Sequence, residues 1–306
     1  PSLPMAQRLV SFPKLLIPEM HKHLQLPLPR ALSTAISDDE KELVLESWAA
    51  EIPHPQKKET GSEDSYFILE RSPADGSSAI GVADGVGGWG QLGIDSGEYS
   101  RALMKHAKIR LQSDVSPPCP VDALSVAYRM VCVQGSSTAC LAVLHNRTLE
   151  ALNLGDSGFV LLRPDEDAGK LQVIAESKEQ THGFNFPFQL GTGSLDYPHH
   201  GDFRSFDVLP GDVIVMATDG LWDNVHQADV VTRVQECRDD SELNKAAGRL
   251  AVDANRIGRD HTARSPFAER AWAENKLDFP GGKLDDVTVV VSQVSLAPSR
   301  SDIPLL

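Results

Sequence analysis

Short apolar runs that end in an acidic turn are the dominant pattern from about residue 60 onward. The run 79–83 leads directly into Asp84–Gly85, and the run 213–217 leads through Thr218 into Asp219–Gly220. Apolar runs of about four to eight residues bounded by turn residues are typical of buried β-strands. The pattern therefore predicts two buried strands, each ending next to a carboxylate.

Further runs extend this pattern over a whole domain. Closely spaced runs at 137–144, 149–154 and 159–162 are joined by turns and predict an antiparallel meander, with additional strands at 65–69 and 286–294. Apolar residues with helical spacing are Tyr99, Leu103, Ala107 and Leu111, and again Leu243, Ala247, Leu250 and Ala254. Strands that cluster, with helices between the clusters, favour an α+β fold with antiparallel sheets over a doubly wound parallel sheet.

The composition narrows the class of protein. The 306 residues are 41% hydrophobic and 24% charged, which is ordinary for globular domains and suffices for one large domain or two smaller ones. The formal net charge of −14 argues against a nucleic-acid partner, which would need a basic face. Apolar runs stay well short of the ~18 residues that a bilayer-crossing helix requires, so no membrane span is predicted.

The cysteines and one sequon carry little functional signal. Cys119, Cys132, Cys140 and Cys237 lie far apart and form no CxxC pair, so we expect free thiols in a reducing compartment. The triplet Asn146–Arg147–Thr148 lies between two strand-like runs and is interpreted as a hairpin turn rather than a glycosylation site.

Residues 1–37 differ from the rest of the chain. They carry four basic residues against the single acid Glu19, a net charge of +3, whereas the remainder carries −17. Six prolines in this stretch interrupt helix formation. Basic, acid-poor leaders resemble organelle transit peptides, and an ordinary flexible arm is the alternative. We therefore expect an N-terminal basic arm or leader remnant at 1–37 and one folded domain at 38–306.

Carboxylates recur in turns next to the apolar strands. They are Glu63–Asp64, Asp84, Asp156, Asp219 and Asp285. Strand ends that pack side by side would bring these groups together, where they would repel one another and burial would raise their pKa values. A divalent cation removes this conflict, and an all-oxygen ligand set suits Mg²⁺ or Mn²⁺ rather than zinc. A single Asp-Gly pair is usually only a turn, so the hypothesis depends on their joint occurrence beside strands.

Five segments, in order along the chain, resemble the motifs of the metal-dependent type 2C protein phosphatases. They are Gly61-Ser-Glu-Asp64, Val82-Ala-Asp-Gly-Val-Gly-Gly-Trp89, Asn153-Leu-Gly-Asp-Ser157, Ala217-Thr-Asp-Gly-Leu-Trp-Asp-Asn224 and Gly281-Gly-Lys-Leu-Asp-Asp-Val-Thr288. The match spans roughly residues 57–294. The DGVGGW form, together with 185–190 and 265–268, is similar to the compact branch that includes mitochondrial and plastid members.

The resemblance implies a four-layer α-β-β-α sandwich, in which helices flank two antiparallel sheets and two Mg²⁺ or Mn²⁺ ions lie at one end. Asp84 would bridge both ions. Glu63 and the Gly85 carbonyl would serve one ion, and Asp219 and Asp285 would serve the other. Asp84 and Asp219 are thus the expected catalytic carboxylates.

The resemblance assigns the remaining acids as well. Asp64 would support a neighbouring ligand within the metal site. Asp156 and Asp223 match positions that hold a third, weaker ion in some relatives. Asp286 stands where many members have Asn, which makes Asp285 the expected ligand of that pair.

The implied activity is hydrolysis of phosphoserine and phosphothreonine in protein substrates by a hydroxide that bridges the two ions. Two positions depart from the family pattern. Glu59 stands where many members have an Arg that grips the phosphate, and Lys57 or Lys58 could substitute only as point charges. Val86 stands where many members have a His that has been proposed as the general acid.

Residues 180–206 form a long polar and aromatic stretch, which predicts a flap that selects substrates. His182 in this stretch is a candidate proton donor, although a lone histidine is more often structural. His199–His200 are an unfavourable metal pair because adjacent residues rarely converge on one ion.

Two other functions stay open at this point: a catalytically silent scaffold of the same fold, and a hydrolase of small phosphoesters. The leader predicts an organellar protein, mitochondrial in the first place, with plastid or cytoplasmic locations as alternatives. The oligomeric state does not follow from the sequence.

Overall fold

A computed structural model describes residues 42–57, 61–113, 119–165, 167 and 169–297, all of which belong to one compact unit, Asp38–Leu306. The expected arm at 1–37 lies outside the described residues, as do Lys58 and Glu59. The boundary at residue 37 therefore stays a prediction.

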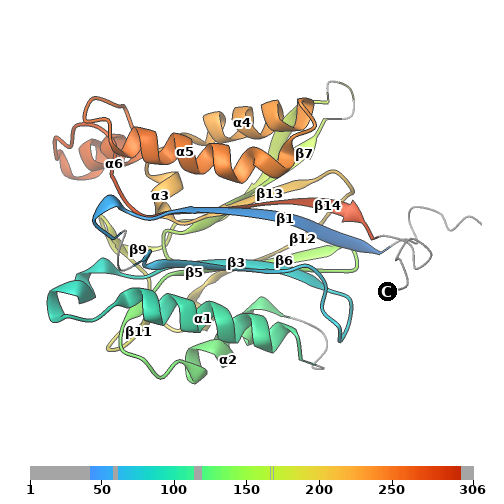
Figure 1. The fold of residues 1–306 in the computed structure, drawn as a ribbon, viewed down its shortest axis with the longest axis horizontal. Helices are drawn as coiled ribbons and strands as arrows, with labels where there is room; N and C mark the ends of the chain where they lie inside the picture. The colour runs from blue at the N-terminus through green and yellow to red at the C-terminus, as the bar shows by residue number, and fades with distance from the viewer. Residues whose placement is uncertain (1–41, 58–60, 114–118, 166, 168, 298–306) are drawn as a thin grey trace, which may run out of the picture. The chain divides into compact units, whose positions relative to one another are not determined.

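Two five-stranded sheets form the centre of this unit (Figure 1). The first contains, in spatial order, β1 (Leu43–Ile52), β14 (Val287–Leu296), β13 (Val213–Ala217), β7 (Gly158–Pro164) and β8 (Leu171–Glu176). The second contains β12 (Asp202–Asp207), β6 (Thr148–Leu154), β5 (Ala139–His145), β3 (Ser78–Asp84) and β2 (Asp64–Leu69). All neighbouring strands in both sheets run antiparallel.

Helices cover the outer face of each sheet, as Figure 1 shows. The face of the first sheet that is turned away from the second sheet is covered by α3 (Asp219–Trp222), α4 (Gln227–Asp239), α5 (Ala246–Gly258) and α6 (Pro266–Asn275). The second sheet is covered by α1 (Ser96–Leu111) and α2 (Pro120–Met130). This four-layer arrangement confirms the predicted α+β sandwich.

The apolar runs are continuous because the central strands are buried on both faces. In β13, Ile214 and Met216 pack into the core between the two sheets, whereas Val213 and Val215 pack beneath α4 and α5. A third core lies between the second sheet and α1 and α2, and Leu103 belongs to it. Each strand end is therefore fixed by packing on two sides.

The predicted helices and strands are present, with one error of topology. Tyr99, Leu103, Ala107 and Leu111 form the buried face of α1. The second helical pattern begins in the 3₁₀ turn η5 (Leu243–Lys245) and continues in α5. The predicted meander is wrong at its third strand, because β7 pairs with β13 in the opposite sheet. The turn after β6 thus crosses between the sheets.

The stretch 180–206 is also more regular than expected. It contains a small hairpin of β9 (Thr181–Gly183) and β10 (Phe186–Pro187), then β11 (Leu190–Gly191), which pairs with β4 (Ser136–Ser137). The 3₁₀ helix η4 (Pro198–His200) follows, and residues 202–207 are the edge strand β12. The flap hypothesis therefore applies to 181–201 only.

Smaller predictions are confirmed. All four cysteines are free thiols, and Asn146 turns the β5–β6 hairpin with φ of 56°. Across the part of the chain that the structure describes, none of the helices combines the length and the apolar character needed to cross a membrane. Two further 3₁₀ helices, η2 (Pro55–Lys57) and η3 (Gly87–Leu92), lie on either side of the β2–β3 pair in the sequence.

Candidate metal centre

The predicted carboxylates converge at one end of the sandwich, where β2 and β14 begin and β3 and β13 end. A pocket of about 290 Å³ opens there. Its walls carry Lys57, Glu63, Asp84, Gly85, Val86, Gly87, Gly88, Thr138, Asp156, Asn185, Pro187, Asp219, Lys283 and Asp285. Six of the eight residues predicted for the metal site therefore line one cavity, and the exceptions are Asp64 and Asp223.

Three of these side chains form a tight group. One carboxylate oxygen from each of Asp84, Asp156 and Asp219 lies within 4.8 Å of the others. Among the described residues, Asp64 Oδ1, Asp156 Oδ1 and Asp219 Oδ1 are buried and find no hydrogen-bond partner. Buried acceptors without a donor are costly unless an ion or water satisfies them. The donor set is thus all oxygen and partly unsatisfied, which fits a divalent cation.

The electrostatics of the pocket support the same conclusion. Burial, followed by the negative charge of Asp219, raises the pKa of both Asp84 and Asp156 well above the usual range. The same two causes raise the pKa of Asp285 from 3.8 to about 7. Without a cation these carboxylates cannot all be ionised at neutral pH, because each charge opposes the next. A divalent ion would reverse this balance.

Gly85 brings its backbone into the pocket wall because only glycine fits there. Its N–H donates to the Glu63 carbonyl at 3.1 Å. An added Cβ would lie 2.7 Å from the carbonyl oxygens of both Glu63 and Ser96. Any larger residue would displace the backbone that follows Asp84, so the glycine fixes the close approach of β3 to the loop before β2.

Glu63 is held from two sides. Ser96 Oγ donates to its Oε1 at 2.8 Å, and Lys57 forms an ion pair with its Oε2. Lys57 also donates to Asp286 Oδ2 at 2.8 Å. Asp286 accepts the backbone N–H groups of His54 and Glu63 at 2.6 and 3.0 Å, so it holds these two residues and is not part of the pocket lining.

Asp64 lies directly behind the pocket. It is 3% exposed, and it pairs in register with Asp84 across β2 and β3. Its Oδ2 accepts a 2.8 Å hydrogen bond from Thr218, the residue before Asp219. Burial, and then the charge of Asp286, raise the pKa of Asp64. It is therefore placed to orient neighbouring strands.

Lys283 and Arg270 were missed from the sequence. Lys283 Nζ lies 2.5 Å from Asp219 Oδ2 and 2.7 Å from Asp223 Oδ2, and Arg270 donates to Asp223 Oδ1 at 2.5 Å. Burial alone would raise the pKa of Asp219, but the ammonium of Lys283 lowers it below the usual value. The one sequence feature that could have indicated the role of Lys283 is its position as a single lysine two residues before the pair Asp285 and Asp286.

The flap hairpin covers one side of the pocket. Asn185 at its tip, with φ of 51°, and Pro187 both line the cavity. His182 instead contacts Asp196 Oδ2 at 2.9 Å and stacks on Phe188, with ring centroids 4.2 Å apart. His182 lines a neighbouring pocket that holds Asp196 and not the one that holds Asp84, which favours its structural interpretation.

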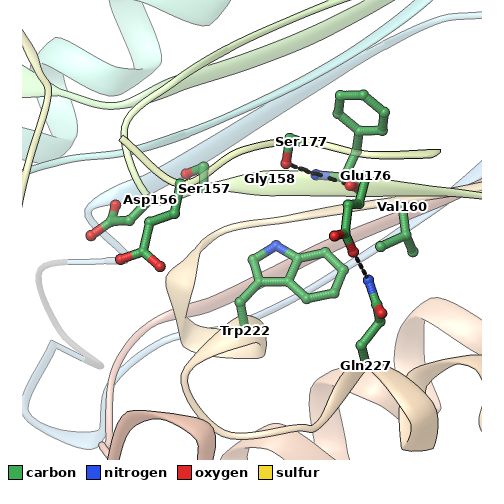
Figure 2. A pocket seen from close by; sticks show the side chains of 10 residues that line it. Asp156, Ser157, Gly158, Val160, Glu176, Ser177, Trp222 and Gln227 are labelled. Carbon is green, nitrogen blue, oxygen red and sulfur yellow. Dashed lines mark hydrogen bonds between the residues drawn. The ribbon is translucent and has the colours of Figure 1, made fainter. Parts of the chain in front are cut away.

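A smaller cavity of about 140 Å³ shares Asp156 with the centre. Figure 2 shows the indole ring of Trp222 in this cavity, with Asp156 to one side and Glu176 bonded to Gln227 on the other. Trp222 Nε1 donates to the Ala217 carbonyl at 3.0 Å, and Ser157 Oγ lies 2.8 Å from Thr138 Oγ1. The contact between Ser157 and Thr138 helps to fix the turn that carries Asp156.

An antiparallel four-layer sandwich with a carboxylate cluster at one end is the arrangement expected of a type 2C protein. Residues 210–263 match the family model described as Protein phosphatase 2C. The chain is 40% identical over 259 residues to Probable protein phosphatase 2C 80 of Arabidopsis thaliana, covering 83% of this chain and 60% of that protein. It is 39% identical over 254 residues to Protein phosphatase PTC7 homolog fig of Drosophila grimshawi, covering 77% and 80%.

A solved structure agrees with these relatives. The photosystem II phosphatase PBCP is similar to this chain with a TM-score of 0.74 and 29% identity, over 82% of this chain and 99% of that one. The chain belongs to the protein phosphatase 2C family. It spans only 60% of the length of the Arabidopsis relative.

Proposed function

We propose that this protein is a metal-dependent protein serine/threonine phosphatase. The observation that carries the proposal is the convergence of Asp84, Asp156 and Asp219, whose ligand oxygens lie within 4.8 Å of one another at the wall of an open pocket. Family membership supports the same activity. A silent scaffold would have no need to keep this costly group of acids together.

Two Mg²⁺ or Mn²⁺ ions would be held by the carboxylates of Glu63, Asp84, Asp219 and Asp285 and by the Gly85 carbonyl. When bound, the ions would lower the pKa of a water molecule and neutralise negative charge on the phosphate. This assignment is supported by the lining of the pocket, which contains all five residues.

The chain's own contribution is to hold the ligands in place. Thr138 Oγ1 accepts the backbone N–H of Asp84 at 3.0 Å, and Ser96 donates to Glu63. Thr218 fixes Asp64 behind Asp84. Phosphoryl transfer depends mainly on positioning and electrostatics, so a rigid ligand frame is the main requirement on the protein.

We infer that Val86, Asn185 and Lys57, which line the same pocket, would face the substrate. Lys57 supplies positive charge at the pocket wall, although it also pairs with Glu63 and Asp286. Because the Val86 side chain has no ionisable proton to donate, we infer that the leaving alcohol takes its proton from solvent.

The test is hydrolysis of a phosphothreonine peptide by chelator-treated protein, with and without added Mn²⁺ or Mg²⁺. We expect turnover only with metal. Asp84→Asn and Asp219→Asn should each lower kcat/KM by more than the roughly 100-fold that loss of a merely supporting group costs. Glu70→Gln, which removes an exposed carboxylate after β2, is the charge-matched control and should retain activity.

The outcomes separate the alternatives. Turnover of p-nitrophenyl phosphate without turnover of phosphopeptides would indicate a small-phosphoester hydrolase. Metal binding without turnover of either substrate would indicate a scaffold. Activity that survives both aspartate substitutions would contradict the proposed centre.

We further infer an organellar location, mitochondrial in the first place, from the basic composition of residues 1–37. The full chain with a C-terminal fluorescent tag should localise to an organelle. Replacing the four basic residues Arg8, Lys14, Lys22 and Arg30 with Gln should make it diffuse. Unchanged localisation of this variant would contradict the inference.

A further inference from the structure

Lys283 places an ammonium group inside the acidic centre. Its Nζ contacts Asp219 Oδ2 at 2.5 Å and Asp223 Oδ2 at 2.7 Å, and lies 3.5 Å from Asp285 Oδ2. The side chain is 17% exposed, and its Nζ lies 5.2 Å from the centroid of the Phe267 ring. One fixed positive charge thus serves three carboxylates.

The backbone holds this lysine firmly. Asn224 Oδ1 accepts the Lys283 N–H at 2.9 Å, and Asn224 Nδ2 donates to the Lys283 carbonyl at 2.8 Å. The preceding residue, Gly282, packs against the end of α5, since an added Cβ there would lie 2.1 Å from the Ile257 carbonyl oxygen. The position of the ammonium group is therefore built into the fold.

Asp223 is fully engaged by cations. Its Oδ2 accepts from Lys283 and its Oδ1 accepts from Arg270 at 2.5 Å, while its side chain is only 4% exposed. Arg270 also lies 3.9 Å from Glu179. Both oxygens of Asp223 are thus taken by fixed positive groups, and neither is turned toward an open position.

The two carboxylate oxygens of Asp219 have different surroundings. Its Oδ2 receives the ammonium of Lys283, whereas its Oδ1 has no hydrogen-bond partner among the described residues. Asp219 also belongs to the tight group with Asp84 and Asp156. One oxygen therefore remains for an ion on the Asp84 side, and the other is closed by the lysine.

We propose that Lys283 is a built-in monovalent cation that limits the number of divalent ions in the centre. It occupies the Asp219–Asp223 side, so ions bind only on the side of Asp84 and Asp285 and Asp223 is not a metal ligand. A divalent ion placed beside a fixed ammonium group would be repelled at short range in a partly buried site. The inference rests on the metal centre proposed above.

The test counts ions rather than turnover. Chelator-stripped full-length protein is titrated with Mn²⁺, and free Mn²⁺ is measured by electron paramagnetic resonance. We expect two ions per chain for the wild type. Lys283→Met, which keeps an unbranched side chain of similar length but removes its charge, should bind one additional ion, because Asp219 and Asp223 lose the ammonium group that they share.

Further variants locate the additional ion. Lys283→Arg keeps the charge and should bind the wild-type number. Lys283→Met combined with Asp223→Asn should return to the wild-type number, since the new ligand is removed. Lys105→Met, at an exposed position on α1, is the control for loss of a lysine charge and should change nothing.

Asp223→Asn alone keeps the proposal testable if Lys283→Met fails to fold. It should leave the wild-type ion count unchanged, and a loss of one ion would overturn the proposal. An unchanged count in a folded Lys283→Met protein would overturn it as well, while leaving the phosphatase proposal intact. A wild type that binds no Mn²⁺ would overturn both.

Discussion

Thr218 Oγ1 donates a 2.8 Å hydrogen bond to Asp64 Oδ2, although the two residues are 154 positions apart in the chain. The same hydroxyl accepts the backbone N–H of Thr288 at 3.1 Å. Through these two bonds one buried hydroxyl ties the end of β13 to the starts of β2 and β14, which belong to both sheets. Asp219 and Asp285, which we propose as metal ligands, lie within three residues of this junction.

Thr218→Val should therefore weaken both the fold and the metal site. It leaves the buried Asp64 carboxylate without its donor, which costs about 1–3 kcal/mol in the free energy of unfolding. Loss of a group that orients ligands also lowers metal affinity by roughly 10-fold or more. Urea denaturation in chelator and Mn²⁺ titration measure the two effects.

Thr218→Ser keeps the hydroxyl and is the matched control for this substitution. It should stay close to the wild type in metal affinity. Equal losses of affinity in the Ser and Val variants would show that keeping the hydroxyl does not preserve the metal site, which would contradict the role given to this hydrogen bond.

Much of this site could be predicted because each strand and the carboxylate that follows it are adjacent in the sequence. Asp84 is the last residue of β3, and Asp219 follows β13 after one residue. Each apolar run therefore predicts where its carboxylate lies. Glycine at position 85 follows from the same local geometry. Burial of these strands on both faces made their apolar runs continuous and easy to recognise.

Other features depend on partners far away in the sequence. Lys283 contacts Asp219 and Asp223, which lie 64 and 60 residues before it in the sequence. No local sequence pattern predicts such a contact. The turn at Asp156 has the same residues whether the chain returns to its own sheet or crosses to the other, which explains the error at β7. The edge strand β1 has a mixed burial pattern without clean alternation, so it was not predicted.

Gly220→Ala should damage the loop that carries Asp285. An added Cβ at this position would lie 1.9 Å from the backbone carbonyl oxygen of Asp286, so the backbone itself must move. We expect a loss of about 3 kcal/mol in stability. Metal affinity should fall roughly 10-fold because Asp285 moves with its neighbour.

Gly248→Ala is the matched control for Gly220→Ala. Gly248 lies within α5, and an added Cβ there meets no atom of the described chain within 4 Å. Alanine is favoured over glycine in a helix by about 1 kcal/mol, so this variant should be as stable as the wild type or more so. If both substitutions cost the same stability, the contact with Asp286 is not the cause.

Asn185→Gly tests whether the β9–β10 hairpin contacts protein substrates. Glycine preserves the left-handed backbone at this position, so only the side chain at the pocket wall is removed. Loss of about one hydrogen bond should raise KM for a phosphothreonine peptide roughly 5-fold. KM for p-nitrophenyl phosphate, which has no peptide chain to contact the hairpin, should change much less. Parallel steady-state assays decide, and equal changes for both substrates would count against a selecting flap.

The pH dependence of stability in the metal-free protein should reveal Asp285. Burial, and then the charge of Asp219, raise its pKa from 3.8 to about 7, so the folded state binds this proton more tightly than the unfolded state does. The group therefore stabilises the fold fully below pH 3.8, and this contribution is lost as the pH rises through about 7. In chelator, the wild type should lose stability relative to Asp285→Asn between about pH 4 and pH 7. Urea denaturation across this range measures the gap, and a gap independent of pH would contradict the burial of this carboxylate.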